Sequence, residues 1–358
     1  MKKINAILCI ASFSITLAMA QSEKQDFDDM YLFALRGDVV TALEIADSYP
    51  DNQLSPEQVA EKARFYSRFR SGDDITITEE SKLANEIMTY FHIYWDKVLL
   101  QKAAGDQALN ELLMSAIPYL FENYLNEKGV SMEDLQQDPV GYLSELFLEE
   151  GYHASIGYTS GIMDIYLWKS ESRKSYEVEL PETSVTVPVL FLEDVVSMGW
   201  QEYATLGKYY PGGWASGSEL YCPRHKYDLQ SEYFKINFIA HEGQHFADYQ
   251  TYPKLGQIDL EYRAKLAEIY LAEETLEDIL SRFLTNNTET RDDPHAFANH
   301  CVMRDLSDLV FKGSQVSDME TWKEISTETI HAGGKQLLAR HSELLKEAGA
   351  SDVTQMIK

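Results

Sequence analysis

The amino-acid sequence predicts an α+β protein that is predominantly helical. Apolar residues recur at three- and four-residue steps from Asp26 to about Gly129 and again from Ser231 to the C-terminus, which is the spacing of amphipathic helices. Between these parts, residues 176–222 are rich in β-branched and apolar residues in rough alternation, which is typical of strands. An apolar content of 44% with 12% aromatics fits a folded chain rather than a disordered one.

Residues 1–20 have the pattern of a secretory signal peptide. A pair of lysines precedes an apolar stretch from about Ile4 to Met19, and the small residues Ala18 and Ala20 suit cleavage after Ala20. The stretch is short for a membrane anchor, and no second apolar run is long enough to cross a bilayer. We therefore expect an exported mature chain, secreted or periplasmic, with no membrane span after cleavage.

The chain is strongly acidic, with a formal net charge of -27 at pH 7. Such a charge opposes binding to phosphate backbones, so nucleic acid is excluded as a partner. Solubility in an exposed compartment explains this acidity more simply than attraction to a basic substrate does.

We interpret residues 21–175 as a helical N-terminal region. Its clearest helical segments, separated by clusters of turn residues, are Met30 to Ala46, Pro56 to Arg70 and Glu80 to Leu100. Such an extension can cover a cleft, restrict access to it or dock another protein. A protein partner for this region is therefore one of the expectations.

Residues 176–222 predict a small sheet. Valines alternate with other residues from Val185 to Val189, and Pro188 within this run favours a sheet edge or a break. The run Tyr210 to Gly213 marks a turn, after which Trp214 to Tyr221 is expected to be extended.

Two cysteines, Cys222 and Cys301, remain after removal of the leader. In an oxidising compartment this pair could form one disulfide bridge, which geometry must decide. Neither cysteine has a partner at short ligand spacing, so a zinc-thiolate site is not expected.

From residue 176 to residue 358 we expect one catalytic region. Its metal-site helices are predicted within residues 231–285 and a helical C-terminal part within residues 286–358. Breaks between helices are expected near Pro253 to Gly256, near Asn286 to Pro294 and near Ala332 to Gly334.

The run from His241 to His245 reads His-Glu-Gly-Gln-His and lies in a predicted helix. Positions four apart share a helix face, so both imidazoles can direct a nitrogen to one ion while Glu242 reaches a water on that ion. Zinc lowers the pKa of such a water towards about 7 and polarises a carbonyl, and a glutamate can carry the water's proton to the leaving group. The motif predicts a hydrolytic site with one Zn²⁺ per chain.

The surroundings of the motif favour a metal site over coincidence. Phe234 and Phe238 lead into the motif on the face that the two histidines continue, so the imidazoles are expected to be buried and to need partners. Gly243 costs about 1 kcal/mol relative to alanine inside a helix, which indicates a close approach at that point. The alternative is a pair of satisfied core histidines with Glu242 on the surface.

A catalytic zinc usually has three protein ligands and one open position. After the break near Gly256, Asp259 can cap a second helix that carries Glu261 and Glu268. These glutamates share a face, but about 10 Å of helix rise separates them, so both cannot bind one ion. We favour Glu261, in the first turns, over Glu268, whose alternative role is a solvated acid.

A His-Glu-x-x-His helix followed by a glutamate on the next helix resembles the gluzincin group of zinc metallopeptidases, which have a thermolysin-like fold. The resemblance covers about residues 185–285. It implies a small thermolysin-like sheet packed on the motif helix, with an edge strand that aligns the substrate backbone. It also implies Glu242 as general base and His241, His245 and Glu261 as zinc ligands.

The run from Glu261 to Lys265 resembles the Glu-x-x-Ala-Asp pattern of several such peptidases, with Lys265 in the place of the acid. In that pattern the acid supports a ligand histidine from the second shell. Asp248, one turn beyond His245, is a candidate for the same support.

Metallopeptidases often carry a residue that stabilises the oxyanion of the tetrahedral state. The candidates here are His295, His300, Tyr249 and His225. The sequence does not choose among them, and His295, which follows a proline break, is the first to test.

Other hydrolytic and nucleotide-binding motifs are absent from the sequence. It contains no Gly-x-Ser-x-Gly elbow, phosphate-binding glycine-rich loop or Cys-x-x-Cys pair. The leading prediction is a secreted or periplasmic zinc metallopeptidase acting on peptides or unfolded segments. The alternatives are a zinc hydrolase for another carbonyl and a non-catalytic helical partner-binding protein with a degenerate metal site.

Overall fold

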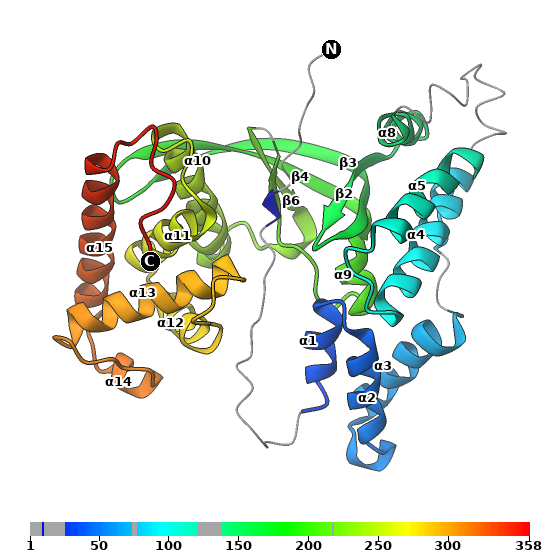
Figure 1. Ribbon diagram of the computed structural model, residues 1–358, viewed down its shortest axis with the longest axis horizontal. Helices are drawn as coiled ribbons and strands as arrows, with labels where there is room; N and C mark the ends of the chain where they lie inside the picture. The colour runs from blue at the N-terminus through cyan, green and yellow to red at the C-terminus, as the bar shows by residue number, and fades with distance from the viewer. Residues whose placement is uncertain (1–8, 11–25, 74–76, 121–137, 217) are drawn as a thin grey trace. The chain divides into compact units, whose positions relative to one another are not determined.

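The computed structural model describes residues 9–10, 26–73, 77–120, 138–216 and 218–358 (Figure 1). The predicted leader, residues 1–20, lies outside the described residues except for the short strand β1 (Cys9–Ile10). In the described part, no helix is both long and apolar enough to span a bilayer. The described elements are mainly helices with one sheet, which confirms an α+β class dominated by helix.

The chain divides into two compact units. The first is built mainly from Ser22–Ser172 and Leu192–Gly212, and the second mainly from Arg173–Phe191 and Gly213–Lys358. All the residues that we expect to hold or serve a metal belong to the second unit.

The first unit is mainly helical. Its helices are α1 (Asp29–Leu35), α2 (Val39–Ser48), α3 (Pro56–Tyr66), α4 (Lys82–Leu100), α5 (Gln107–Leu120), α8 (Pro139–Glu149) and α9 (Gly199–Ala204). Its core includes Phe91 and Trp95 of α4 and Trp200 of α9, which are fully buried.

The single helix expected from Met30 to Ala46 is wrong, because the chain forms two helices there. Gly37 has a positive φ of 81°, a conformation that ends a helix and that glycine adopts without strain. Asp38 then begins α2, where its side chain accepts a hydrogen bond from the backbone N–H of Thr41.

Within the described residues the strands form one sheet. Their order is β1, β5 (Trp214–Ser216), β6 (Glu219–Pro223), β4 (Ser184–Met198), β3 (Ile162–Glu179) and β2 (His153–Thr159). Strands β2 and β3 are antiparallel, with His153 opposite Trp168 and Thr159 opposite Ile162, and β5 and β6 are antiparallel as well. Strands β3 and β4 contribute residues to both units.

Strand β2 begins at His153 and β3 at Ile162, so the expectation that residues 21–175 are all helical is wrong. The first seven residues of β3, Ile162 to Trp168, are all buried. A continuous buried run shows no alternation, and periodicity alone cannot distinguish it from a buried helix.

Pro188 does not mark a sheet edge or a break. It lies inside β4, which has neighbours on both sides in the sheet.

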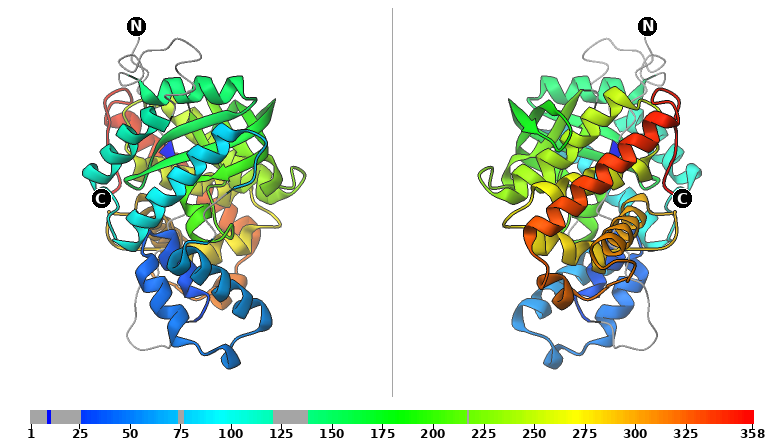
Figure 2. Two further views of the ribbon diagram at one scale, coloured as in Figure 1. Left: turned by 90° about the vertical axis from the view of Figure 1, so that its right-hand side faces the viewer. Right: turned by 90° about the vertical axis from the view of Figure 1, so that its left-hand side faces the viewer.

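The second unit holds the remaining helices. A π-helical segment, Tyr233–Ala240, precedes α10 (His241–Thr251), α11 (Gln257–Leu271), α12 (Leu276–Thr285), α13 (Pro294–Val310), α14 (Met319–Lys323) and α15 (Thr327–Glu347). The breaks expected near Pro253 to Gly256 and near Asn286 to Pro294 are confirmed. The long helix α15 packs along α11 and α13 (Figure 2).

The break expected near Ala332 to Gly334 is wrong, because α15 continues through it. A Cβ on Gly333 would lie 2.7 Å from Leu306 Cδ1, and one on Gly334 would lie 3.0 Å from Ile269 Cγ2. These glycines therefore allow α15 to approach α13 and α11 closely, a packing role that outweighs the low helix propensity of glycine.

Asp259 does not cap α11, which begins two residues earlier, after Gly256. Its fully buried carboxylate instead accepts hydrogen bonds through Oδ1 from the backbone N–H groups of Met356 and Ile357. The Nε2 atom of His341 lies 3.0 Å from the same oxygen. Asp259 thus ties the C-terminal segment to α11.

Cys222 and Cys301 are both buried and both unbridged. Cys222 packs in the apolar cluster beside the sheet, whereas Cys301 packs among helices α11 to α15. Separate clusters hold the two thiols, so the pair forms no disulfide.

Asp164 in β3 gives the first unit a predicted pH dependence. Burial raises the pKa of its carboxyl from 3.8 to about 7, although hydrogen bonds from the backbone N–H groups of Trp200 and Ile165 lower it. A folded-state pKa raised above the unfolded value stabilises the fold below about pH 4, and this contribution is lost as the pH rises to about 7. Relative to Asp164→Asn, the wild type should lose about 3–4 kcal/mol of unfolding free energy over that window. Urea titrations of both proteins across the window measure this loss, and parallel pH profiles would contradict it.

Candidate metal centre

The motif helix follows a π-helical segment, and this changes which way its side chains face. Hydrogen bonds in a π turn join residues five apart, so side chains beyond Tyr233–Ala240 are rotated relative to those of a continuous α-helix. Phe234 and Phe238 pack in the apolar cluster beside the sheet, whereas the two motif histidines face α11. The single stripe expected to join these four residues is therefore wrong.

Gly243 lies where α10 meets the sheet. A Cβ at this position would lie 3.2 Å from Val187 Cγ2 and 3.4 Å from Val185 Cγ1, closer than side chains normally pack. The close approach expected from this glycine is confirmed. Its partner is strand β4, which holds the motif helix on the sheet.

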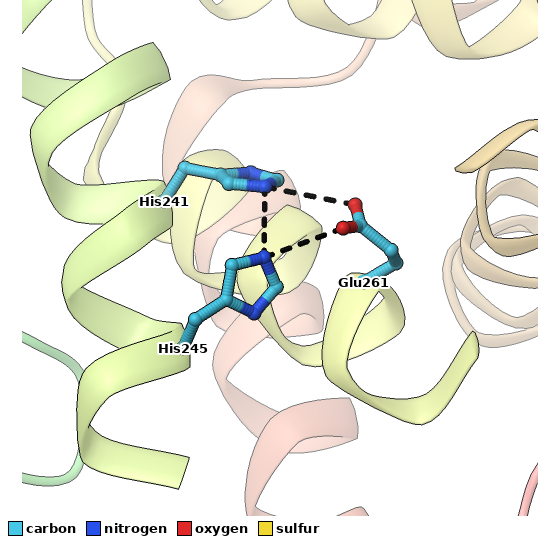
Figure 3. A group of neighbouring side chains, drawn as sticks. All are labelled: His241, His245 and Glu261. Atoms are coloured by element: carbon cyan, nitrogen blue, oxygen red, sulfur yellow. Dashed lines mark hydrogen bonds and ion pairs between the residues drawn. The ribbon is translucent and has the colours of Figure 1, made fainter. Parts of the chain in front are cut away.

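Three ligand-type atoms converge between α10 and α11 (Figure 3). The Nε2 atoms of His241 and His245 lie 3.2 Å apart. Oε2 of Glu261 lies 3.6 Å from the first of these atoms, and Oε1 lies 3.3 Å from the second. Taken as one ligand atom per residue, the three atoms lie within 4.8 Å of one another. Ligand atoms on a tetrahedral zinc ion are about 3.3–3.6 Å apart, so the nearest contacts here are close to that spacing. The exposed fractions of the three side chains are 10%, 15% and 6%.

Glu268 contacts Nδ1 of His241, the ring nitrogen that does not face His245 and Glu261. Its Oε1 lies 2.7 Å from His241 Nδ1, and its Oε2 accepts a hydrogen bond of 2.7 Å from Arg282. Glu268 is 1% exposed, so its alternative role as a solvated acid is wrong. A carboxylate on the second nitrogen of an imidazole fixes the orientation of the ring, so Glu268 keeps Nε2 of His241 directed at His245 and Glu261.

The Glu261 carboxylate is surrounded by basic groups. His295 Nδ1 lies 2.8 Å and Lys265 Nζ lies 3.4 Å from its Oε2. Burial alone would raise the pKa of Glu261, but the charges of His295 and Lys265 and a hydrogen bond from His245 hold it well below its usual range. Glu261 is therefore ionised at neutral pH, as a metal ligand must be.

His245 carries a proton in the metal-free chain. Burial lowers the pKa of its ring, but the neighbouring carboxylates, that of Glu261 most strongly, raise it to about 9. A metal ligand must be neutral imidazole, so an ion that binds at neutral pH must displace this proton.

Asp248 makes no hydrogen bond to His245 among the described residues. Its Oδ1 accepts hydrogen bonds of 3.0 Å from Gln244 and 2.9 Å from Arg263. Its Oδ2 and the Nδ1 of His245 are both buried without a hydrogen-bond partner. The support of a motif histidine expected from Asp248 is therefore not among its described contacts, and Asp248 instead joins α10 to Arg263 of α11. The carboxylate that contacts a motif histidine in this way is that of Glu268, which the sequence did not indicate.

Glu242 is 6% exposed, so the alternative that places it on the surface is wrong. Its charge is close enough to raise the pKa of His245. Glu242 is therefore a buried carboxylate whose charge reaches the triad formed by His241, His245 and Glu261.

Of the four oxyanion candidates, the structure brings His295 to the triad, where it contacts Glu261. The His300 ring stacks on Phe297 in the same helix, α13, and Tyr249 is 44% exposed. His225 lies in the single turn Arg224–Lys226 after β6.

The charged side chains around the triad are compatible with a bound cation. Three acidic side chains, Glu242, Glu261 and Glu268, face two basic ones, Lys265 and Arg282. These five side chains sum to one net negative charge in a buried setting, which the proton of His245 balances in the metal-free chain. A cation that displaces this proton would take over that role. The role of Arg282 was not expected from the sequence. Its contact with Glu268 joins two helices, α11 and α12, and such a contact produces no regular spacing of residues that a sequence would show.

Comparisons with known proteins identify no relative. No protein-family model matches the chain, no curated protein matches it, and no solved structure matches it.

Proposed function

We propose that this chain is an exported zinc metallopeptidase in which His241, His245 and Glu261 hold one zinc ion. The observation that carries the proposal is the convergence of three buried ligand atoms at zinc-like spacing, with Glu268 on the second nitrogen of His241. Burial matters here because unpaired polar groups destabilise a fold. A divalent ion would occupy the space that the three atoms enclose.

Each residue has a defined task in hydrolysis. Bound zinc supplies a Lewis acid and lowers the pKa of a water that it holds. Glu242 accepts the proton of the attacking water and passes it to the leaving group. Glu268 keeps the Nε2 of His241 directed at the ion, and the neighbouring strand β4 fixes the position of the helix that carries both histidines.

Two parts of the proposal rest on the sequence pattern. The peptide substrate rests on the resemblance of the motif helix and Glu261 to gluzincin peptidases, as does a thermolysin-like arrangement of sheet and helix. The packing of Gly243 on β4 is compatible with that arrangement. Export rests on the pattern of residues 1–20. A protein partner of the helical first unit is also part of the proposal.

Zinc content of the purified protein tests the metal site. We expect one zinc per wild-type chain, and we expect His245→Ala and Glu261→Ala to weaken zinc binding by more than about 100-fold, since loss of a second-shell partner alone costs about 10–100-fold. His300→Ala, which changes a histidine outside the triad, should bind zinc like the wild type. Competition with a chelator measures the affinities. A wild type that takes up no zinc would overturn the proposal.

A panel of quenched fluorescent peptides and simple esters tests the substrate class. Cleavage of peptides that depends on added zinc supports a peptidase. Turnover of esters with no cleavage of peptides would assign the site to another carbonyl.

A further inference from the structure

The two oxygens of Glu261 have different neighbours. Oε1 lies 3.3 Å from Nε2 of His245, which is itself a proposed ligand atom. Oε2 lies 3.6 Å from Nε2 of His241. It lies closer to two residues outside the triad, 2.8 Å from Nδ1 of His295 and 3.4 Å from Nζ of Lys265. Metal binding would take His245 Nε2 away from Oε1 and leave the two basic neighbours of Oε2 in place.

The basic groups on Oε2 are held in position by packing. The Lys265 side chain is 7% exposed, lies one helical turn after Glu261 in α11, and places its ammonium 5.1 Å from the centre of the Phe283 ring. The ring of His295 is 20% exposed and lies at the start of α13, two residues after Asp293, whose side chain caps that helix. Neither group can move into bulk water without loss of these contacts.

A nitrogen and a carboxylate oxygen 2.8 Å apart repel each other unless the nitrogen carries a proton, so Nδ1 of His295 is assigned as a protonated nitrogen. No hydrogen bond of regular geometry reaches Oε2, so the attraction of His295 and Lys265 for this oxygen is mainly electrostatic. A metal ion placed on Oε2 would lie next to a buried ammonium and be repelled by it. Oε1 instead faces His245, whose proton a bound metal ion displaces.

We propose that His295 and Lys265 are positioning residues that hold Oε2 of Glu261 and so direct Oε1 alone to the metal. This inference rests on the proposed zinc site. A glutamate bound through one oxygen leaves the fourth coordination position to water, whereas a glutamate bound through both oxygens crowds it. His295 then acts on the metal through Glu261, and with Nδ1 directed at Glu261 it is a positioning residue and not the oxyanion donor.

Cobalt substitution tests the proposal without using activity. Visible absorption of protein-bound Co²⁺ is intense for four-coordinate ions and weak for five- or six-coordinate ions. We expect the wild type to show the intense spectrum. We expect His295→Ala and Lys265→Met to weaken Co²⁺ and Zn²⁺ binding by about 10–100-fold and to lower the absorption as Glu261 turns to bind through both oxygens.

Matched variants control for general effects of substitution. His300→Ala removes a histidine from the same helix, and Lys323→Met removes an exposed lysine that pairs with Glu320. Both should keep the wild-type affinity and spectrum. His295→Gln, whose side-chain amide can donate to Oε2, should recover part of what His295→Ala loses. Because Lys265 is buried, its substitution could unfold the protein, so melting curves of the metal-free variants check that each one is folded. If Lys265→Met is unfolded, the result for His295→Ala alone tests the positioning role.

The outcomes separate this inference from the zinc proposal. A wild type that binds neither ion overturns the zinc site itself. A wild type that binds Co²⁺, together with a His295→Ala variant of unchanged affinity and spectrum, overturns only the positioning role. If that variant in addition loses about 10²–10³-fold in kcat, His295 is an oxyanion donor after all.

Discussion

Glu242→Gln is expected to lower kcat by about 10²–10⁴-fold while the protein keeps its zinc. Glutamine has the shape of glutamate but cannot accept a proton from water, and Glu242 is not one of the three converging ligand residues. The loss should therefore fall on the chemical step and leave the metal site intact. Hydrolysis of the fluorescent peptide panel at saturating substrate measures kcat, and metal analysis of the same sample measures zinc.

The exposed glutamate Glu343 in α15 provides the control. Glu343→Gln removes the same charge away from the triad and should hydrolyse peptides at the wild-type rate. If Glu242→Gln is as active as the wild type, Glu242 is not the general base. If it loses both zinc and activity, its role is in metal binding and the proposed division of tasks is wrong.

Local spacing was enough to predict which residues converge. His241 and His245 are four residues apart, and any helix with about 3.6 residues per turn places two such residues on the same face. The rise of a helix excluded both glutamates on one ion, and Glu261 was preferred because it lies in the first turns, near the loop from the motif helix. The structure places Glu261 at the two histidines and Glu268 at the second ring nitrogen of His241. Both results depend on geometry within one or two adjacent helices.

Residues of other helices that contact Glu261 and Glu268 could not be predicted in this way. Arg282 and His295 reach Glu268 and Glu261 from α12 and α13, and nothing in the spacing of the sequence links these pairs. The sequence offered Glu268 as the second choice of ligand or as a solvated acid on a charged helix, whereas contacts between helices bury it against His241.

The fold departs from expectation where packing overrides a local preference. Gly333 and Gly334 are poor helix formers, but their lack of a side chain lets α15 lie close to α13 and α11. The strand residues from Ile162 to Trp168 show no alternation because the whole run is buried. In each case the environment that decides the structure is supplied by residues far away in the sequence.

Arg263→Met is expected to destabilise the second unit by about 3–5 kcal/mol, the range observed when one partner of a buried ion pair is removed. Arg263 is 2% exposed, and it donates hydrogen bonds to Asp248 of α10, to Ser342 of α15 and to Glu182 between β3 and β4. Methionine fills part of the space but leaves the Asp248 carboxylate buried without its cation. Urea unfolding with a probe in the second unit measures the loss.

Burial already raises the pKa of Asp248, and Arg263 is the strongest influence that lowers it. In Arg263→Met the folded-state pKa of Asp248 rises further above the unfolded value. The variant should therefore recover stability as the pH falls and the carboxyl takes up a proton, and lose it as the pH rises through that raised pKa.

Two comparisons test whether the loss comes from the buried pair. Arg304→Met removes a half-exposed partner of Asp305 and should cost less than about 1 kcal/mol, as surface ion pairs do. The double variant Arg263→Met with Asp248→Leu removes both buried charges and should be more stable than Arg263→Met alone, because no unpaired carboxylate remains. If the double variant is no more stable, Arg263 acts through Glu182 and Ser342 instead.

Loss of the Arg263–Asp248 pair should also weaken zinc binding, whereas Arg304→Met should not. Asp248 follows His245 by one turn and Arg263 follows Glu261 by two residues, so a shift of either residue would move a proposed ligand.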